Sequence, residues 1–166
     1  ILACDVTEMA NDKQQAEPGA QATLATLSQA GLERPKDASG AVQAIPATLD
    51  NGYYSEAAVV ALETLGFDPY IATGRQQHHS AQAEAPEMPA TVQERMAAKI
   101  RTPAGKALYA RRKVIVEPVF GQLKEARGFR RFLLRGLATI RGEWRLVCLT
   151  HNLLKIWRYG RVLRVI

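Results

Sequence analysis

The 166-residue chain has only two cysteines, Cys4 and Cys148, and no long apolar run that is free of charged residues. Two cysteines so far apart in the sequence do not make a disulfide framework, so we expect both to be buried free thiols in a reducing cytoplasm. No segment has the length and flanks of a membrane span or a signal peptide, so we expect no membrane partner. Internal repeats and coiled-coil heptads of sufficient length are also lacking.

Acidic residues are scarce in the C-terminal part of the chain. Residues 99–166 contain 17 Lys and Arg but only 3 Asp and Glu, a net charge of +14. Residues 1–98 contain 5 and 13, a net charge of −8. Such an asymmetry is typical of a region that binds a polyanion. A basic surface that only aids solubility is the structural alternative. A membrane surface is disfavoured, because the basic residues do not oppose a clean apolar stripe.

Apolar patterns and turn signals predict alternating strands and helices in the first part of the chain. We expect strands at residues 1–6, 44–49 and 67–72, and helices at residues 20–30 and 56–65, the second burying Ala57, Val60, Ala61 and Leu65. This alternation implies an α/β fold with crossover connections. Asp50 would then lie at the C-terminal end of a strand, where open α/β sheets place their ligands.

A polar segment, residues 76–100, follows the predicted strands. It holds the adjacent pair His78 and His79, which lacks the further His or Cys that a zinc site requires. Near its end we expect a helix from about Met96, broken near residues 102–105. The last helix is predicted at residues 137–159, with an apolar seam at a spacing of three and four. That seam contains Leu137, Ile140, Trp144, Val147, His151 and Leu154, with His151 as a core histidine whose hydrogen bonds are satisfied.

One carboxylate, Glu117, lies among cations in residues 109–124. On a helix, spacings of four and three residues bring near one face Tyr109, Lys113, Glu117, Gly121 and Lys124. Val114 and Ile115 fall on another side and can pack inward. Glu117 is either an ion-pair partner of Lys113 or a metal-binding carboxylate among residues that hold phosphates. Pro118 predicts a bend or a restart of the helix beside it.

Several stretches resemble bacterial insertion-sequence transposases of the DDE class. Residues 109–124 are similar to the Tyr–Arg–Glu–Lys signature of that family, and the best match is Tyr109, Arg112, Glu117 and Lys124. The first two lie one residue farther from the Glu than in the commonest form, which leaves Lys113 as an alternative to Arg112. Residues 49–56, Leu-Asp-Asn-Gly-Tyr-Tyr-Ser-Glu, resemble the family sequence around its second catalytic Asp. Residues 11–15 and 141–155 extend the resemblance over nearly the whole chain.

The resemblance implies an RNase H-like catalytic core, incomplete at its N-terminal side, with a basic helical C-terminal part. It implies metal-dependent DNA cleavage and strand transfer, in which Asp50 and Glu117 are catalytic ligands of a two-metal site that takes Mg²⁺ or Mn²⁺. The implied DNA-binding residues are Tyr109, Arg112, Lys113 and Lys124. The implied partners are transposon ends and target DNA, together with a second subunit in a homodimer of the intact enzyme. The implied location is the bacterial cytoplasm, at the nucleoid.

The first catalytic Asp of the family has no clear counterpart here. The chain begins at Ile1 within an apolar run, and Asp5 resembles a position that follows that Asp, so we interpret Asp5 as structural. We therefore expect residues 1–166 to be a partial and inactive catalytic domain. Its parts would be residues 1–75 with the second Asp, the polar connector 76–100, and the basic helices 101–166 with the catalytic Glu.

Other interpretations of the sequence stay open. If Asp5 were the first catalytic Asp, the set of three carboxylates would be complete. A basic DNA-binding module without chemistry would explain the charge of residues 99–166 equally well. An RNase H-like nuclease or resolvase unrelated to transposition would share the fold and the metal chemistry, but the Tyr–Arg–Glu–Lys resemblance argues against it.

Overall fold

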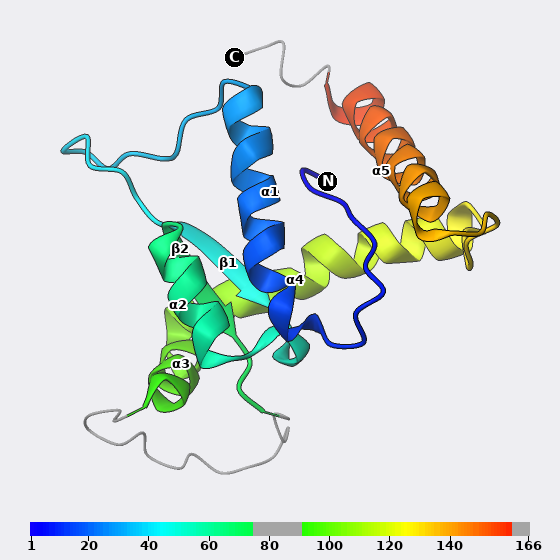
Figure 1. The fold of residues 1–166 in the computed structure, drawn as a ribbon. Coiled ribbons are helices and arrows are strands. Elements are labelled where there is room, and N and C mark those ends of the chain that lie inside the picture. The colour runs from blue at the N-terminus through cyan, green and yellow to red at the C-terminus, as the bar shows by residue number, and fades with distance from the viewer. Residues whose placement is uncertain (75–90, 161–166) are drawn as a thin grey trace.

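The computed structural model describes residues 1–74 and 91–160 (Figure 1). In chain order its elements are η1 (Asp12–Gln14), α1 (Ala16–Gln29), β1 (Ile45–Leu49), η2 (Asn51–Tyr53), α2 (Glu56–Thr64), β2 (Phe67–Ile71), α3 (Val92–Arg101), α4 (Pro103–Gly121), η3 (Gln122–Ala126) and α5 (Leu137–Tyr159). His78 and His79 lie outside the described residues. The mixture of helices with a small parallel sheet agrees with the predicted α/β class.

Strands β1 and β2 form a two-stranded parallel sheet, in register from Ile45 opposite Phe67 to Leu49 opposite Ile71. Parallel strands need a crossover connection, and here η2 and α2 supply it. The two strands predicted at residues 44–49 and 67–72 are confirmed. Within the described residues β1 has only β2 beside it, so its other edge is open and tolerates Pro46, which has no N–H to donate.

Helix ends follow local signals in the sequence. Ser55 Oγ accepts the N–H of Ala58 at 3.1 Å and caps α2. Gly66 ends the helix with φ of +83°, and a side chain at this position would meet the Arg34 guanidinium, which donates to the Leu65 carbonyl at 2.7 Å. The chain can therefore turn into β2 directly after the helix.

The core lies between the sheet, α1, α2 and α3. Its buried side chains are Ala16, Ala20, Ala58, Val59, Leu62, Phe67, Tyr70, Ile71, Met96 and Ile100. The prediction for α2 was right only in part. Ala61 and Leu65 are half-buried, whereas Ala57 and Val60 face solvent and Ala58 and Val59 are buried in their place. Helix α2 must cover both β2 and α1, and the stripe of Ala58, Val59 and Leu62 is the one that contacts them.

The strand predicted at residues 1–6 is not formed. This segment is irregular, and Ile1 and Leu2 are exposed. No described strand lies beside it to complete a ladder of hydrogen bonds, so its polar groups bind side chains of α5 instead. In Figure 1 the segment passes between α1 and α5.

Helices α3 and α4 meet at a sharp break, as expected near residues 102–105. Thr91 and Glu94 form a capping box at the start of α3, which begins at Val92, four residues before the predicted start. Thr102 Oγ1 then accepts the Gly105 N–H at 3.0 Å and caps α4, with Pro103 in its first turn.

Helix α4 is long, and its C-terminal part extends away from the sheet (Figure 1). It continues through Pro118 to Gly121, and the π-helical turn η3 extends it. Val114 and Ile115 are 70% and 55% exposed, so the prediction that they pack inward was wrong. At this distance from the sheet no described element covers their side of the helix.

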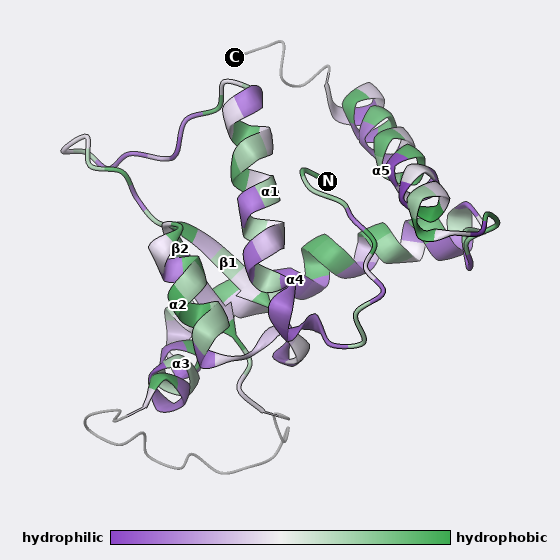
Figure 2. Cartoon of the chain, in the orientation of Figure 1, coloured by the Kyte–Doolittle hydropathy of each residue, from purple (hydrophilic) through white to green (hydrophobic). Residues whose placement is uncertain are grey.

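Helix α5 has the predicted bounds and the predicted seam. Of the seam residues His151 is buried, and Leu137, Ile140, Trp144, Val147 and Leu154 are half-buried; Cys148, next to the seam, is buried as well. The helix stands apart from the sheet at the far end of α4, and apolar stretches remain on its surface (Figures 1 and 2). None of the helices in residues 1–74 and 91–160 is long and apolar enough to span a membrane.

Candidate active site around Asp50

Asp50 follows β1 directly and therefore stands at the C-terminal end of the sheet. Its Oδ1 accepts the N–H of Asn51 at 2.8 Å, which caps the short turn η2. The packing of η1 on η2 brings a second carboxylate, Asp12, to the same turn. Burial raises the pKa of the Tyr53 hydroxyl, and the charges of Asp12 and Asp50 raise it further. Both carboxylates thus act on one tyrosine.

Arg112 is the residue that α4 presents to Asp50. Its Nη1 lies 3.2 Å from Asp50 Oδ2, and its guanidinium lies 5.5 Å from the centre of the Tyr109 ring. Leu108 and Tyr109 pack against the core and so fix this turn of the helix. Lys113, the alternative from the sequence, is exposed. The Arg112 Nε is buried and has no hydrogen-bond partner within the described residues.

Asp50 and Arg112 line a cavity of about 730 Å³ beside the open edge of β1. Ala16, Gly19, Ala20 and Thr23 of α1 form one wall, and Val116 and Phe120 of α4 form another. Arg112, Val116 and Phe120 are spaced by four residues and therefore share one face of α4. The site is thus an open groove whose lining includes one ion pair.

Glu117 is exposed and does not line this groove. It follows Arg112 by five residues, which corresponds to roughly 140° around an α-helix, so the two side chains leave α4 in different directions. The structure brings Asp50 together with Arg112 and shows no contact between Asp50 and Glu117. Their joint role in catalysis stays a prediction.

The described residues do not by themselves fit a two-metal site. Residues 1–74 and 91–160 contain no group of three or more His, Cys, Asp or Glu side chains that could hold a metal ion. Both oxygens of Asp50 are already engaged, one by the Asn51 N–H and the other by Arg112. Asp12 is a nearby carboxylate that the sequence analysis did not propose as a site residue.

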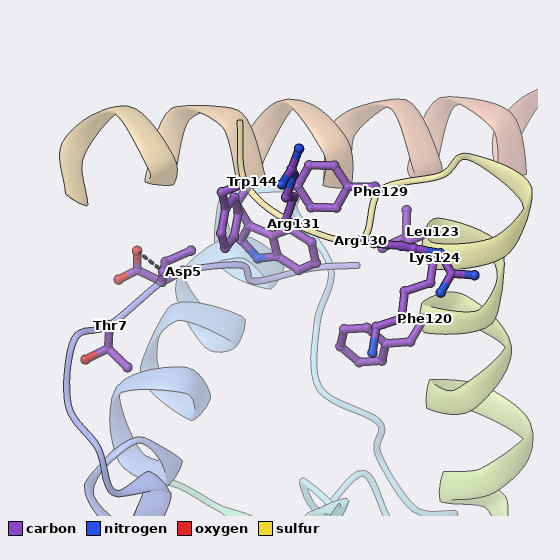
Figure 3. Close-up of a pocket in the computed structure, with 11 residues that line it drawn as sticks. Asp5, Thr7, Phe120, Leu123, Lys124, Phe129, Arg130, Arg131 and Trp144 are labelled. Atoms are coloured by element: carbon purple, nitrogen blue, oxygen red, sulfur yellow. Dashed lines mark hydrogen bonds between the residues drawn. The ribbon is translucent and has the colours of Figure 1, made fainter. Parts of the chain in front are cut away.

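Lys124 lies at a second cavity, of about 430 Å³, between η3, α5 and the N-terminal segment (Figure 3). Its Nζ is 5.9 Å from the centre of the Phe120 ring. The centre of the Phe129 ring lies 6.2 Å from that of Trp144, in a stacked arrangement, and 5.5 Å from that of Phe132, edge-on. These ring contacts hold the loop before α5 against the helix.

Asp5 belongs to this second cavity and not to the groove at Asp50. Its Oδ1 lies 3.0 Å from Arg141 Nε of α5 and accepts the Val6 N–H at 2.8 Å. These contacts hold the N-terminal segment in place and agree with the structural role predicted for Asp5.

Comparison with known proteins identifies the family. Residues 72–157 match a family model described as a transposase DDE domain. The matched range contains Tyr109, Arg112, Lys113, Glu117 and Lys124, whereas Asp50 precedes it. No curated protein and no solved structure matches the chain significantly. Since the family match covers just over half of its residues, the chain belongs to the transposase DDE domain family.

Proposed function

We propose that this chain is part of an insertion-sequence transposase of the Tyr–Arg–Glu–Lys type, which cleaves and joins DNA strands. Membership of the transposase DDE domain family supports it and implies DNA as the partner. The observation that carries the proposal is the contact between Arg112 and Asp50. It joins the two stretches of sequence that resemble the catalytic motifs, one inside the matched range and one before it.

The proposed core is RNase H-like, and in the intact enzyme Asp50 and Glu117 serve as ligands of Mg²⁺ or Mn²⁺. The described residues contain no group of three or more His, Cys, Asp or Glu side chains that could hold a metal ion, so we derive no catalytic step for the chain by itself. The proposed division into residues 1–75, 76–100 and 101–166 assigns Asp50 to the first part and Glu117 to the last. A bacterial cytoplasmic location at the nucleoid and a homodimer of the intact enzyme complete the proposal.

DNA would meet the basic helices through its phosphates. Arg111 and Lys113 are exposed on α4, and Arg131 and Arg135 are exposed between η3 and α5. Such contacts are independent of base sequence and release counterions, so affinity falls as salt rises. Arg112 contributes least in this state, because Asp50 already neutralises it.

DNA binding is tested with a labelled duplex of arbitrary sequence, by fluorescence anisotropy over a series of salt concentrations. We expect a steep fall of affinity with salt, and neutralising Lys113→Gln or Lys124→Gln reduces the slope by about one unit each. The matched control is Lys36→Gln, because Lys36 is also exposed but pairs with Glu33 in the acidic half. Binding that ignores salt, or an equal effect of Lys36→Gln, contradicts the proposal.

Strand cleavage is tested separately with supercoiled plasmid and Mg²⁺ or Mn²⁺. We expect the chain to nick no more DNA than its Asp50→Ala variant does. Metal-dependent nicking that disappears in Asp50→Ala would show that the site is complete and that the interpretation as a partial domain is wrong.

A DNA-binding module without chemistry is the second candidate, and the lack of a three-carboxylate group in the described residues favours it. The two candidates differ once N-terminal residues of a DDE transposase that carry its first catalytic Asp are joined to Ile1. Cleavage restored by them, and lost again in Asp50→Ala and Glu117→Gln, supports the transposase. Cleavage that is never restored supports the binding module.

A further inference from the structure

The first six residues of the chain run along α5 in the opposite direction. At one end the Ile1 nitrogen donates to Asn152 Oδ1 at 2.7 Å, and Asn152 Nδ2 donates to the Ile1 carbonyl at 2.7 Å. At the other end Arg141 Nε donates to the Val6 carbonyl at 2.9 Å and pairs with Asp5. The segment is therefore fixed on α5 at both ends, across about three turns of the helix.

Cys4 and Cys148 meet in the middle of this alignment. They are the only cysteines of the chain, and both are free thiols. Cys148 is buried on the covered side of α5, whereas Cys4 is partly exposed. Burial, and after it interaction with the Cys4 side chain, raise the pKa of the Cys148 thiol to about 12. Two residues separated by 143 others in the sequence thus interact directly.

We propose that Cys4 and Cys148 form a redox modification site, at which a small disulfide such as oxidised glutathione joins them into a protein disulfide. The flanking contacts at Asn152 and Arg141 hold the two side chains together before any oxidant arrives. Cys4 reacts first, because it is the thiol that solvent reaches. Cys148 is protected from reagents in solution but has Cys4 as its neighbour.

The exchange proceeds in two steps that balance. Cys4 Sγ loses its proton, attacks one sulfur of oxidised glutathione and forms a mixed disulfide, and one glutathione leaves as a thiolate that takes up a proton. Cys148 Sγ then loses its proton and attacks Cys4 Sγ, and the second glutathione leaves in the same way. Two protein thiols are oxidised and one glutathione disulfide is reduced to two thiols.

The cross-link acts on the second cavity. Asp5, Val6 and Thr7 line this cavity, and Figure 3 shows Asp5 and Thr7 on one side of it and Phe120 and Lys124 on the other. A bond at Cys4 ties the N-terminal segment covalently to α5, whereas in the dithiol state only the contacts described above hold it. The bond also closes a loop that includes most of the chain, which constrains the unfolded state and raises the thermal midpoint.

Peptide mapping tests the proposal on the whole chain. The protein is equilibrated with mixtures of oxidised and reduced glutathione, its remaining thiols are alkylated, and it is digested with trypsin without reduction. Trypsin releases residues 1–13, which end at Lys13 and contain Cys4, and residues 146–155, which end at Lys155 and contain Cys148. We expect these two peptides joined in monomeric protein at oxidising mixtures, and separate after reduction.

The variants Cys4→Ser and Cys148→Ser are the controls. Each is expected to lose the joined peptide and the redox dependence of the thermal midpoint. Cys4→Ser changes a partly exposed residue of an irregular segment, so it serves if Cys148→Ser fails to fold. Glutathione retained on Cys4 of the wild type, or disulfides found only between two chains, would overturn the proposal.

Discussion

The α/β part of the molecule and its basic helical part bury their apolar side chains very differently. In the α/β part, α1, α2, α3 and the two strands enclose one continuous core, to which α4 contributes only Leu108 and Tyr109. From residue 110 to residue 160 the buried side chains are few: Leu123, Cys148 and His151. One part is therefore organised by its core, whereas the other is organised by local helix formation and by a ring cluster.

The exposed apolar residues of the second part follow helical spacings. Leu146, Leu149, Leu153, Ile156 and Trp157 are all exposed on α5, as are Val114, Ile115 and Val116 on α4. The same part carries most of the positive charge of the chain. A domain that must hold long DNA does not need a closed apolar core everywhere, because phosphate contacts depend on exposed Lys and Arg. The difference between the two parts thus parallels the proposed division between fold and DNA contact.

The largest effect is expected from truncating matched leucines in the two parts. Leu62 of α2 is 2% exposed, whereas Leu149 of α5 is 53% exposed. Leu62→Ala leaves a cavity in the core and is expected to lower the free energy of unfolding by about 2–5 kcal/mol. Leu149→Ala is expected to change it by less than about 0.5 kcal/mol.

Urea denaturation followed by circular dichroism measures both variants. Equal losses of stability would contradict the comparison, because they would mean that the exposed face of α5 is covered in solution. A loss for Leu149→Ala that grows with protein concentration would identify a second copy of the chain as the cover.

His151 gives the next effect, and it depends on pH. Its ring is buried, and neither ring nitrogen has a hydrogen-bond partner within the described residues, so the predicted satisfied histidine was only half right. Burial lowers its pKa, and the charges of Lys155 and Arg127 lower it further. The folded state therefore favours the neutral ring, and the unfolded chain binds a proton first as pH falls below about 6.5.

The free energy of unfolding is therefore not reduced by His151 above the pKa of the unfolded state. It decreases as pH falls from about 6.5 towards the lower pKa of the folded state. His151→Leu removes this loss, and above that range it raises the free energy of unfolding by about 1 kcal/mol because no polar atom stays unpaired. His151→Gln is the matched control, since it removes the titration but keeps a buried polar group. Thermal melts between acid and neutral pH distinguish the three proteins, and identical pH profiles would rule out the effect.

Local signals predicted much of this fold. Ser55, Gly66 and the alternation of apolar residues gave the βαβ unit, and the seam of α5 gave its bounds to the residue. These features depend on residues that are close together in the chain, so they can be recognised in a single sequence. Three predictions that depend on distant neighbours failed: the strand at residues 1–6, the burial of Ala57 and Val60 on α2, and the inward packing of Val114 and Ile115. Which face of an element is covered depends on where the other elements lie.

The features of the candidate site also divide into those that depend on local sequence, which could be predicted, and those that depend on distant segments, which could not. The Asn-Gly turn after a strand placed Asp50 correctly, because the turn and the strand are both local. The choice between Arg112 and Lys113 could not be made from helix phase, since it depends on how Tyr109 packs against the core. Asp12 and the Cys4–Cys148 contact were missed because each requires two segments that are far apart in the sequence.

The smallest effect concerns the ion pair that links the two parts. Arg112 and Asp50 are 26% and 59% exposed and make one contact at 3.2 Å. Arg95 and Glu63 form a matched pair within the α/β part, with hydrogen bonds from Nη1 at 2.8 Å and from Nη2 at 3.2 Å. Because solvent weakens exposed pairs, both coupling energies are expected to lie below about 1 kcal/mol.

Double-mutant cycles measure the two couplings under one set of conditions. The cycles combine Arg112→Met with Asp50→Asn, and Arg95→Met with Glu63→Gln, and each coupling is read from urea denaturation. The Arg95–Glu63 coupling is expected to be the larger, since two parallel hydrogen bonds fix its geometry and Arg112 makes only one contact. A weak Arg112–Asp50 pair suits the proposed role of Asp50, because Arg112 must release the Asp50 carboxylate when another charged group binds in the groove. An Arg112–Asp50 coupling that exceeds the Arg95–Glu63 value would instead make the pair a fixed structural bond and would count against Asp50 as a site residue.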